Sequence, residues 1–261
     1  MSVPEYLPIA ACIFLLGMSK GGFPIGAVVL PTLILVWPTA IGPAKHAVAF
    51  MLPLLCTMDV VAVTLYRAHI QWRRVIHLVP GSLIGVLLGS IFFISDSHAF
   101  ISVSDRALKI IIGSIGILFV VYRLGRHWLA AHIPHRETPR PAVNLGFGLT
   151  AGLTSTLAHA AGPVAQIYFL MQNLPKMQFA ATIAGFFFGL NLLKLIPFVA
   201  LGRLDLATLS LAAKMLPVVP LGVGAGYLIV RTMKGTWYLA FIHIILFITA
   251  TTLIWKAITA G

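Results

Sequence analysis

Long apolar segments are the feature that most constrains how this chain can fold. Two clear examples are Ala44 to Leu65 and Thr236 to Ile254, and each has the roughly 20 residues that a helix needs to cross a bilayer. Membrane β-strands would instead show alternation over about 10 residues. Hydrophobic residues make up 59% of the 261 positions and charged residues only 9%. The sequence therefore predicts an all-α polytopic membrane protein with about 8–10 membrane helices.

A glycine-rich stretch around Lys20 separates two short apolar arms near the start of the chain. The arms, Tyr6 to Leu16 and Ala27 to Trp37, have about a dozen residues each, too few for a complete crossing as a helix. Irregular backbone at membrane depth is tolerated only where protein buries it or where it lines a watery cavity. The break is therefore a candidate binding site, with Lys20 beside the backbone N–H groups of Gly21 and Gly22 at the start of the second arm.

A basic, proline-containing stretch at residues 124–142 divides the chain into two similar halves, residues 1–123 and 143–261. Proline and charge break helices and favour water, so this stretch is predicted to be a linker. Each half opens with two short arms around a break, at Lys20 and at Ala158 to Pro163. Longer segments follow: Ala44 to Leu65, Val75 to Ile94 and Ala107 to Tyr122, then Phe179 to Leu201, Leu206 to Val230 and Trp237 to Ile254. The order predicts two five-segment repeats.

Small residues in corresponding segments support this repeat. The fourth and ninth segments share a proline and two glycines at the same spacing: Pro80, Gly85 and Gly89 in one, Pro217, Gly222 and Gly226 in the other. Each half crosses the membrane an odd number of times, whether its short arms cross or re-enter, so the repeats are expected to be inverted. Transporters built in this way bind substrate near the midplane, where broken helices of the two repeats meet.

Charge is distributed unevenly along this predicted topology. Most loop Lys and Arg residues lie on the side of the linker, which the positive-inside rule places in the cytoplasm, with both termini on the opposite side. Topology and attraction to anionic lipid explain most of the net charge of +12, and anion binding is the remaining interpretation. Because only 6 acidic residues are present, a carboxylate-lined cation channel is excluded.

Polar side chains inside the apolar segments are few, and such residues usually face a cavity or a partner. Lys194 lies near the middle of the segment from Phe179 to Leu201, too deep to reach the interface easily. Asn191 precedes it by one turn on the same helix face. We interpret both as candidates for binding an anion. Lys20 is a further candidate, with a lysine that extends to the membrane interface as the alternative.

The second break contributes three more candidates. His159 can donate a hydrogen bond to an oxyanion and titrates near neutral pH; alternatively, it satisfies backbone carbonyls that the break leaves unpaired. Gly162 lies where the next arm begins, so its N–H group is available at a helix start. Gln166 lies one turn further along, where it could donate to a ligand or bridge two helices.

Asp59 is the one acidic residue within an apolar segment. Pairing with Lys194 would make it a candidate proton-coupling carboxylate, a role for which His159 is the other candidate. Without that pairing, we expect Asp59 to cap loop backbone near Arg67.

No arrangement typical of an enzyme is found in the sequence. Ser155, Thr156 and His159 share one short stretch, but no third group is present to orient them as a catalytic triad. Cys12 and Cys56 lie in apolar segments and predict neither a disulfide nor a metal site. We therefore expect a carrier without catalytic residues, metal or cofactor, and no binding of nucleic acid.

Motifs in both halves together resemble one known family. In the first half they are Gly17-Met18-Ser19-Lys20-Gly21-Gly22-Phe23, then Pro31, then Leu78-Val79-Pro80-Gly81-Ser82-Leu83-Ile84-Gly85. In the second half they are Gly162-Pro163, Ala181-Thr182, Asn191-Leu192-Leu193-Lys194 and Gly202-Arg203-Leu204-Asp205. These motifs are similar to those of the sulfite exporter TauE/SafE-type family. Pro24-Ile25 and Ala27-Val28 stand where members often carry more glycines.

The resemblance implies transport, typically outward, of a small inorganic or organic sulfur anion across the bacterial inner membrane, driven by the proton gradient. We expect a secondary carrier that works by alternating access. Its further expected partners are the proton and membrane lipid, and a homodimer is a candidate assembly. The expected substrate contacts are Lys20, Gly21, Gly22, His159, Gly162, Gln166, Asn191 and Lys194. The alternatives are an anion channel, an importer of another small organic anion, and a non-transporting accessory membrane protein.

Overall fold

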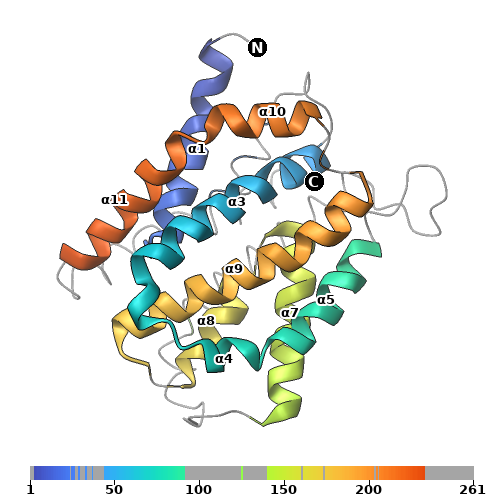
Figure 1. Cartoon of the computed structure of the whole chain (residues 1–261), viewed down its shortest axis with the longest axis vertical. Helices are drawn as coiled ribbons and strands as arrows, with labels where there is room; N and C mark the ends of the chain where they lie inside the picture. Colours follow the sequence, from blue (N-terminus) through green and yellow to red (C-terminus); the bar gives the residue numbers. More distant parts are fainter. Residues whose placement is uncertain are drawn as a thin grey trace.

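The computed structural model describes residues 3–23, 25–26, 44–91, 140–159, 161–172, 174–202 and 206–232, together with positions 29, 33, 37, 125 and 204. Its elements are α1 (Val3–Lys20), α3 (Ala44–Tyr66), the 3₁₀ helix η2 (Arg67–His69), α4 (Trp72–Ile76), α5 (Val79–Ile91), α7 (Pro141–Ala158), α8 (Gly162–Leu170), α9 (Lys176–Ala200), α10 (Leu206–Met215) and α11 (Val218–Thr232). The described residues contain helices and no strand (Figure 1), which confirms the all-α prediction for them.

Two helical stretches of the described chain, Ala49–His69 and Met177–Ala200, are long and apolar enough to cross a membrane. A third candidate is the pair Thr208–Met215 and Val218–Thr232, which is bent by 49° at its break. A helical membrane protein is thus confirmed at this level. Several predictions lie outside the described residues: the segments from Ala107 to Tyr122 and from Trp237 to Ile254, most of the arm from Ala27 to Trp37, and nearly all of the linker.

Each predicted break contains a helix end, although α1 continues through Gly17 to Lys20, which the sequence places in the first break. α1 ends at Lys20, and the chain turns through Gly22 with a φ of 105°, a conformation that favours glycine. α7 ends at Ala158, and His159 follows in the left-handed region with a φ of 48°. The His159 N–H donates to the carbonyl oxygen of Ser155 at 2.9 Å, so the irregular turn satisfies one of the carbonyls at the end of α7.

Two segments that were predicted as single spans are each broken in the structure. The segment from Val75 to Ile94 contains the end of α4 and the start of α5, and the segment from Leu206 to Val230 contains α10 and α11. A proline lies at each break, Pro80 in the first turn of α5 and Pro217 directly before α11. Proline has no N–H to donate to the preceding turn, so it favours the start of a new helix at both places.

Two close crossings join elements of the first half to elements of the second. α1 packs against α11, and α7 packs against α5. A Cβ on Gly17 would lie 3.0 Å from the Cα of Gly222, and a Cβ on Gly152 would lie 3.0 Å from the Cα of Gly85. Only glycine permits this approach of two backbones. Gly85 and Gly222, which the sequence matched between halves, therefore have matching packing roles.

α3 and α9 run side by side through the centre of the described structure (Figure 1). Among the described residues, Phe50, Met51 and Leu54 of α3 are fully buried in the larger of the two apolar clusters. The ends of α1 and α7 lie against these two central helices. Polar groups at both breaks are thus brought to one region between α3 and α9.

Candidate functional site

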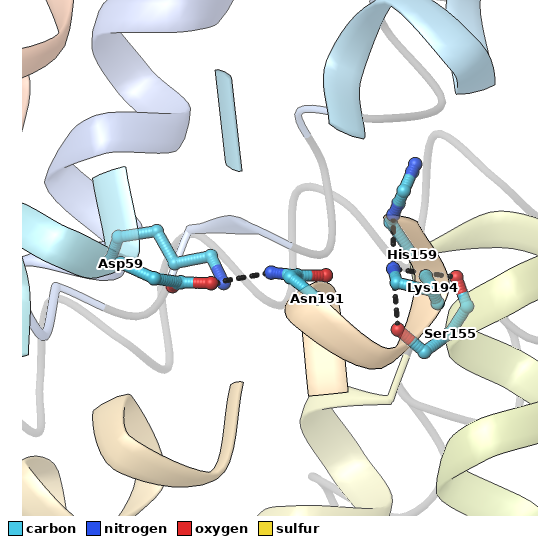
Figure 2. Close-up of polar contacts among 6 residues, drawn as sticks. Asp59, Ser155, His159, Asn191 and Lys194 are labelled. Atoms are coloured by element: carbon cyan, nitrogen blue, oxygen red, sulfur yellow. Dashed lines mark hydrogen bonds and ion pairs between the residues drawn. The ribbon is translucent and has the colours of Figure 1, made fainter. Parts of the chain in front are cut away.

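The carboxylate of Asp59, on α3, joins the first break to both central helices. Its Oδ1 lies 2.7 Å from the Nζ of Lys20, at the end of α1, and its Oδ2 accepts a hydrogen bond from the side-chain amide of Asn191 on α9 (Figure 2). The Asp59 side chain is fully buried, and that of Lys20 is 13% exposed. Lys20 Nζ also lies 4.3 Å from the ring centroid of Phe187, one turn before Asn191. Lys20 is therefore held by an anion and an aromatic face.

The ammonium group of Lys194, one turn after Asn191 on α9, is held at the second break by neutral acceptors. Its Nζ lies 2.9 Å from Ser155 Oγ, 3.2 Å from the Ser155 carbonyl oxygen and 2.8 Å from His159 Nδ1 (Figure 2). These three acceptors match the three N–H groups of an ammonium, provided that His159 Nδ1 is unprotonated. Lys194 is fully buried. Within the described part of the chain, no carboxylate pairs with it, because Asp59 pairs with Lys20.

Comparison with known proteins decides the family. The model of the family described as sulfite exporter TauE/SafE matches residues 9–253, nearly the whole chain. The protein belongs to this family. No significant match was found among curated proteins or among solved structures. Membership confirms the resemblance and implies a membrane transporter of the sulfite-exporter type rather than an enzyme.

Neither partner that the sequence suggested for Asp59 in this TauE/SafE protein is correct. Asp59 pairs with Lys20 and Asn191, and not with Lys194 or with backbone near Arg67. The end of α1 lies against α3, so the Lys20 ammonium reaches the carboxylate directly. Lys194 lies one helical turn further along α9, where it faces the end of α7.

The backbone of the first break also differs from the prediction. The N–H of Gly21 donates to the Gly17 carbonyl at 2.8 Å, and the N–H of Gly22 donates to the Ser19 carbonyl at 3.1 Å. Both groups therefore complete the C-terminal turn of α1 and are not available N–H donors at the start of the second arm, as expected from the sequence. The Gly21 carbonyl accepts a hydrogen bond from the Tyr66 hydroxyl at 2.9 Å, which fixes the break to the end of α3.

The remaining predicted residues of the second break lie on α8. Gly162 is the first residue of this helix, and a Cβ built there would meet open space. Gln166 is half-buried one turn further along. The hydrogen bonds that hold Asp59 and Lys194 do not involve Gln166. The structure thus unites Lys20, Asn191, Lys194 and His159 with Asp59, and it leaves Gln166 outside this polar cluster.

Ser155 and Phe187 contact the two lysines of the polar cluster, although the sequence predicts a binding role for neither. Ser155 was considered only as a nucleophile, but it supplies two of the three acceptors around Lys194. Phe187 supplies the aromatic face under Lys20. A sequence signal exists for each: Ser155 lies in the last turn before a break, where carbonyls lack helix partners, and Phe187 lies one turn before Asn191 on the same face.

Proposed function

We propose that this TauE/SafE family member is a secondary transporter that exports a small sulfur-containing anion, sulfite or an organosulfonate, across the bacterial inner membrane. The observation that carries this proposal is the buried Lys194 ammonium, which is held by neutral acceptors while Asp59 neutralises Lys20. Burying a charge without a counter-ion is costly. An anion bound beside Lys194 would supply the missing opposite charge and would be held strongly.

The proposed substrate site lies between the two breaks, where α1 and α3 of the first half meet α7 and α9 of the second. Lys20, Asn191, Lys194 and His159 provide its cations and hydrogen-bond donors, with the start of α8 at Gly162 as a further donor. Gly21 and Gly22 shape the first break, and Gln166, half-buried on α8, is proposed as a further hydrogen-bond donor at the second. These are proposed roles, supported by the burial of the polar cluster and by its position between elements of both halves.

Alternating access is proposed as the mechanism, with residues 1–123 and 143–261 as the two moving repeats. Two glycine crossings, Gly17 against Gly222 and Gly152 against Gly85, support an internal repeat. In each crossing the first helix of one half, α1 or α7, packs against a helix of the other half, α11 or α5. Motion of one half relative to the other would change which side of the membrane reaches a site between them. In this proposal the linker is cytoplasmic and both termini are periplasmic.

Coupling to the proton gradient is proposed to use Asp59 or His159. Each can change its charge by one, and each contacts a lysine of the cluster: Asp59 contacts Lys20 and His159 contacts Lys194. Protonation of either residue makes the cluster more positive by one unit. The affinity for an anion and the occupancy of that proton are therefore linked.

Transport by the purified full-length protein in proteoliposomes tests the proposal, with radiolabelled sulfite as the probe. Lys194→Met is expected to lower the initial rate by about 10- to 100-fold, the effect of losing a charged hydrogen-bond donor. The matched control is Lys214→Met, which removes an exposed lysine on α10 and is expected to keep the wild-type rate. A folded Lys194→Met variant with wild-type transport would overturn the proposal. Saturation and acceleration by anion on the opposite side identify a carrier, whereas an unsaturable flux identifies a channel.

A further inference from the structure

We infer that the polar cluster selects anions with a single negative charge, so that a sulfonate or hydrogen sulfite is the bound form and a dianion such as sulfate is rejected. This inference rests on the proposed function and concerns the charge of the substrate, which the family assignment does not define. Asp59 is the residue that sets the selectivity. Each lysine, Lys20 or Lys194, forms a cationic half-site for one negative charge. The Asp59 carboxylate occupies the half-site of Lys20.

The charges of the cluster support a single vacancy for negative charge. Counted as ammonium groups, Lys20 and Lys194 contribute two positive charges, and Asp59, counted as a carboxylate, contributes one negative charge. His159, whose Nδ1 lies 2.8 Å from Lys194 Nζ, is counted as a neutral imidazole. Cys56, one turn before Asp59 on α3, carries a free thiol and adds no charge when protonated. The net formal charge of these groups is therefore +1, which one monoanion neutralises.

In the two halves of the cluster, residues at matching distances from a helix start or from a glycine crossing differ in charge. Asp59 and Asn191 each lie 15 residues after the first residue of their helices, α3 and α9. Lys20 and Ser155 each lie three residues after the glycine, Gly17 or Gly152, that forms its crossing. In both halves a lysine links the end of the broken arm to the central helix: Lys20 extends from α1 to α3, and Lys194 extends from α9 to α7.

The difference between the halves is the acceptor that each lysine meets. Lys20 meets a carboxylate, whereas Lys194 meets a hydroxyl, a carbonyl and an imidazole nitrogen, none of which is an acid. The residue of α9 at the same distance from its helix start as Asp59 in α3 is the neutral Asn191. One half-site is thus neutralised within the protein, and the other retains its charge for a substrate.

Burial makes this charge balance decisive. The side chains of Asp59 and Lys194 are fully buried, and charges in such surroundings are poorly screened by water and salt. A monoanion brings the cluster to neutrality. A dianion would leave one uncompensated negative charge beside Asp59, which costs more than its extra attraction to Lys194 returns.

Two probes of nearly equal shape, methanesulfonate and sulfate, test the inference because they differ mainly by one unit of charge. Binding to purified full-length protein is measured by competition with radiolabelled sulfite at fixed pH and ionic strength. For the wild type we expect methanesulfonate to compete at least about tenfold more strongly than sulfate. Asp59→Asn keeps the side-chain shape and raises the net charge to +2. The ratio of the affinity for sulfate to that for methanesulfonate is therefore expected to rise by at least about tenfold.

The chain offers a matched exchange that separates net charge from the local ion pair. Asn191→Asp lowers the net charge to zero and is expected to weaken binding of both anions. The double variant Asp59→Asn/Asn191→Asp moves the carboxylate to the equivalent position and restores +1, so it is expected to recover the preference for methanesulfonate. Because the exchange preserves the numbers of carboxylates and amides, it also provides the test if Asp59→Asn does not fold.

The outcomes distinguish the inference from the proposed function. Equal competition by sulfate and methanesulfonate in the wild type overturns the inference and leaves anion transport intact. An unchanged ratio in folded Asp59→Asn, or no recovery in the folded double variant, also overturns it. A folded wild-type protein that neither binds nor transports sulfite contradicts the proposed function itself.

Discussion

Asp59 on α3 and Asn191 on α9 each lie 15 residues after the first residue of their helix and contact each other directly. The Asn191 amide donates to Asp59 Oδ2, and both side chains are almost completely buried. The two central helices, one from each half of the chain, are therefore joined by a carboxylate–amide pair. Lys20 contacts Asp59 of this pair, and Lys194 follows Asn191 by one helical turn and contacts the second break.

Replacement of Asn191 by leucine tests the structural part of this relationship. Asn191→Leu keeps the approximate volume but leaves Asp59 Oδ2 without its donor, which is expected to lower the free energy of unfolding by about 1–3 kcal/mol. Leu192→Ala on the same helix is the control, because this side chain is 42% exposed. Thermal unfolding in detergent provides the measurement. Equal melting temperatures for Asn191→Leu and wild type would contradict the contact.

The glycine crossing between α5 and α7 gives a second test with a control in the same helix. A Cβ on Gly148 would lie 3.0 Å from the Cα of Gly81 and closer still to the backbone of Leu78, whereas a Cβ on Gly146 would meet nothing within 4 Å. Gly148→Ala is expected to destabilise the protein by about 1–3 kcal/mol through overpacking. Gly146→Ala is expected to be neutral or to stabilise α7 by about 0.5–1 kcal/mol. Equal effects of the two substitutions on thermal unfolding would rule out this close approach.

The helix ends at the two breaks could be predicted from the sequence because glycines or proline mark both breaks. The length of the first arm was predicted wrongly, since α1 runs from Val3 to Lys20 and not from Tyr6 to Leu16. The matched spacing of Gly85 and Gly222 likewise indicated equivalent packing before any contact was known. By contrast, the bends between α4 and α5 and between α10 and α11 were missed, because hydropathy is continuous through Pro80 and Pro217.

The partners of the two buried lysines could not be predicted in the same way. Asp59 was the obvious counter-ion for Lys194 when only the inventory of charges was considered. The true pairing depends on helix neighbours: the end of α1 contacts α3, while Lys194 faces the end of α7. Such pairings are set by tertiary packing, which brings together residues more than 30 positions apart, such as Lys194 and Ser155.

The orientation of the protein in the membrane gives a third prediction. The linker at residues 124–142 is expected in the cytoplasm because most loop cations lie on its side. A reporter that is active only in the cytoplasm, inserted into the linker, should be active, and one that requires the periplasm should be inactive. The reverse fusions at the C-terminus serve as the control. A periplasmic linker would invert the proposed topology and the assignment of the two faces.

Proton coupling can be assigned to one of the two candidate residues by comparing their neutral variants. His159→Gln retains an acceptor for Lys194 but no longer titrates, and Asp59→Asn is the corresponding change at the other lysine. Loss of the coupling residue is expected to abolish stimulation by an imposed proton gradient while anion exchange continues. Both fluxes are measured in proteoliposomes with methanesulfonate, which remains a monoanion across the working pH range. If both folded variants keep full stimulation, neither residue couples the proton.

The ion pair between Lys20 and Asp59 allows the structural and binding roles of Lys20 to be separated. Lys20→Met leaves a fully buried carboxylate without its cation, which is expected to destabilise the protein by about 3–5 kcal/mol. The double variant Lys20→Met/Asp59→Asn removes both charges, keeps the net charge of the cluster and is expected to recover most of that stability. Thermal unfolding of the two variants measures this recovery of stability. If the double variant is no more stable than Lys20→Met, Lys20 does not stabilise the fold through its ion pair with Asp59.

Transport by the stable double variant then reports on contact between Lys20 and the anion. If Asp59 fills the half-site of Lys20, the substrate charge is met by Lys194, and the double variant should transport sulfite within about tenfold of the wild-type rate. A direct substrate contact by Lys20 instead predicts a loss as large as that of Lys194→Met. The two results differ because Lys20 is still needed in the absence of Asp59 only if Lys20 itself contacts the anion.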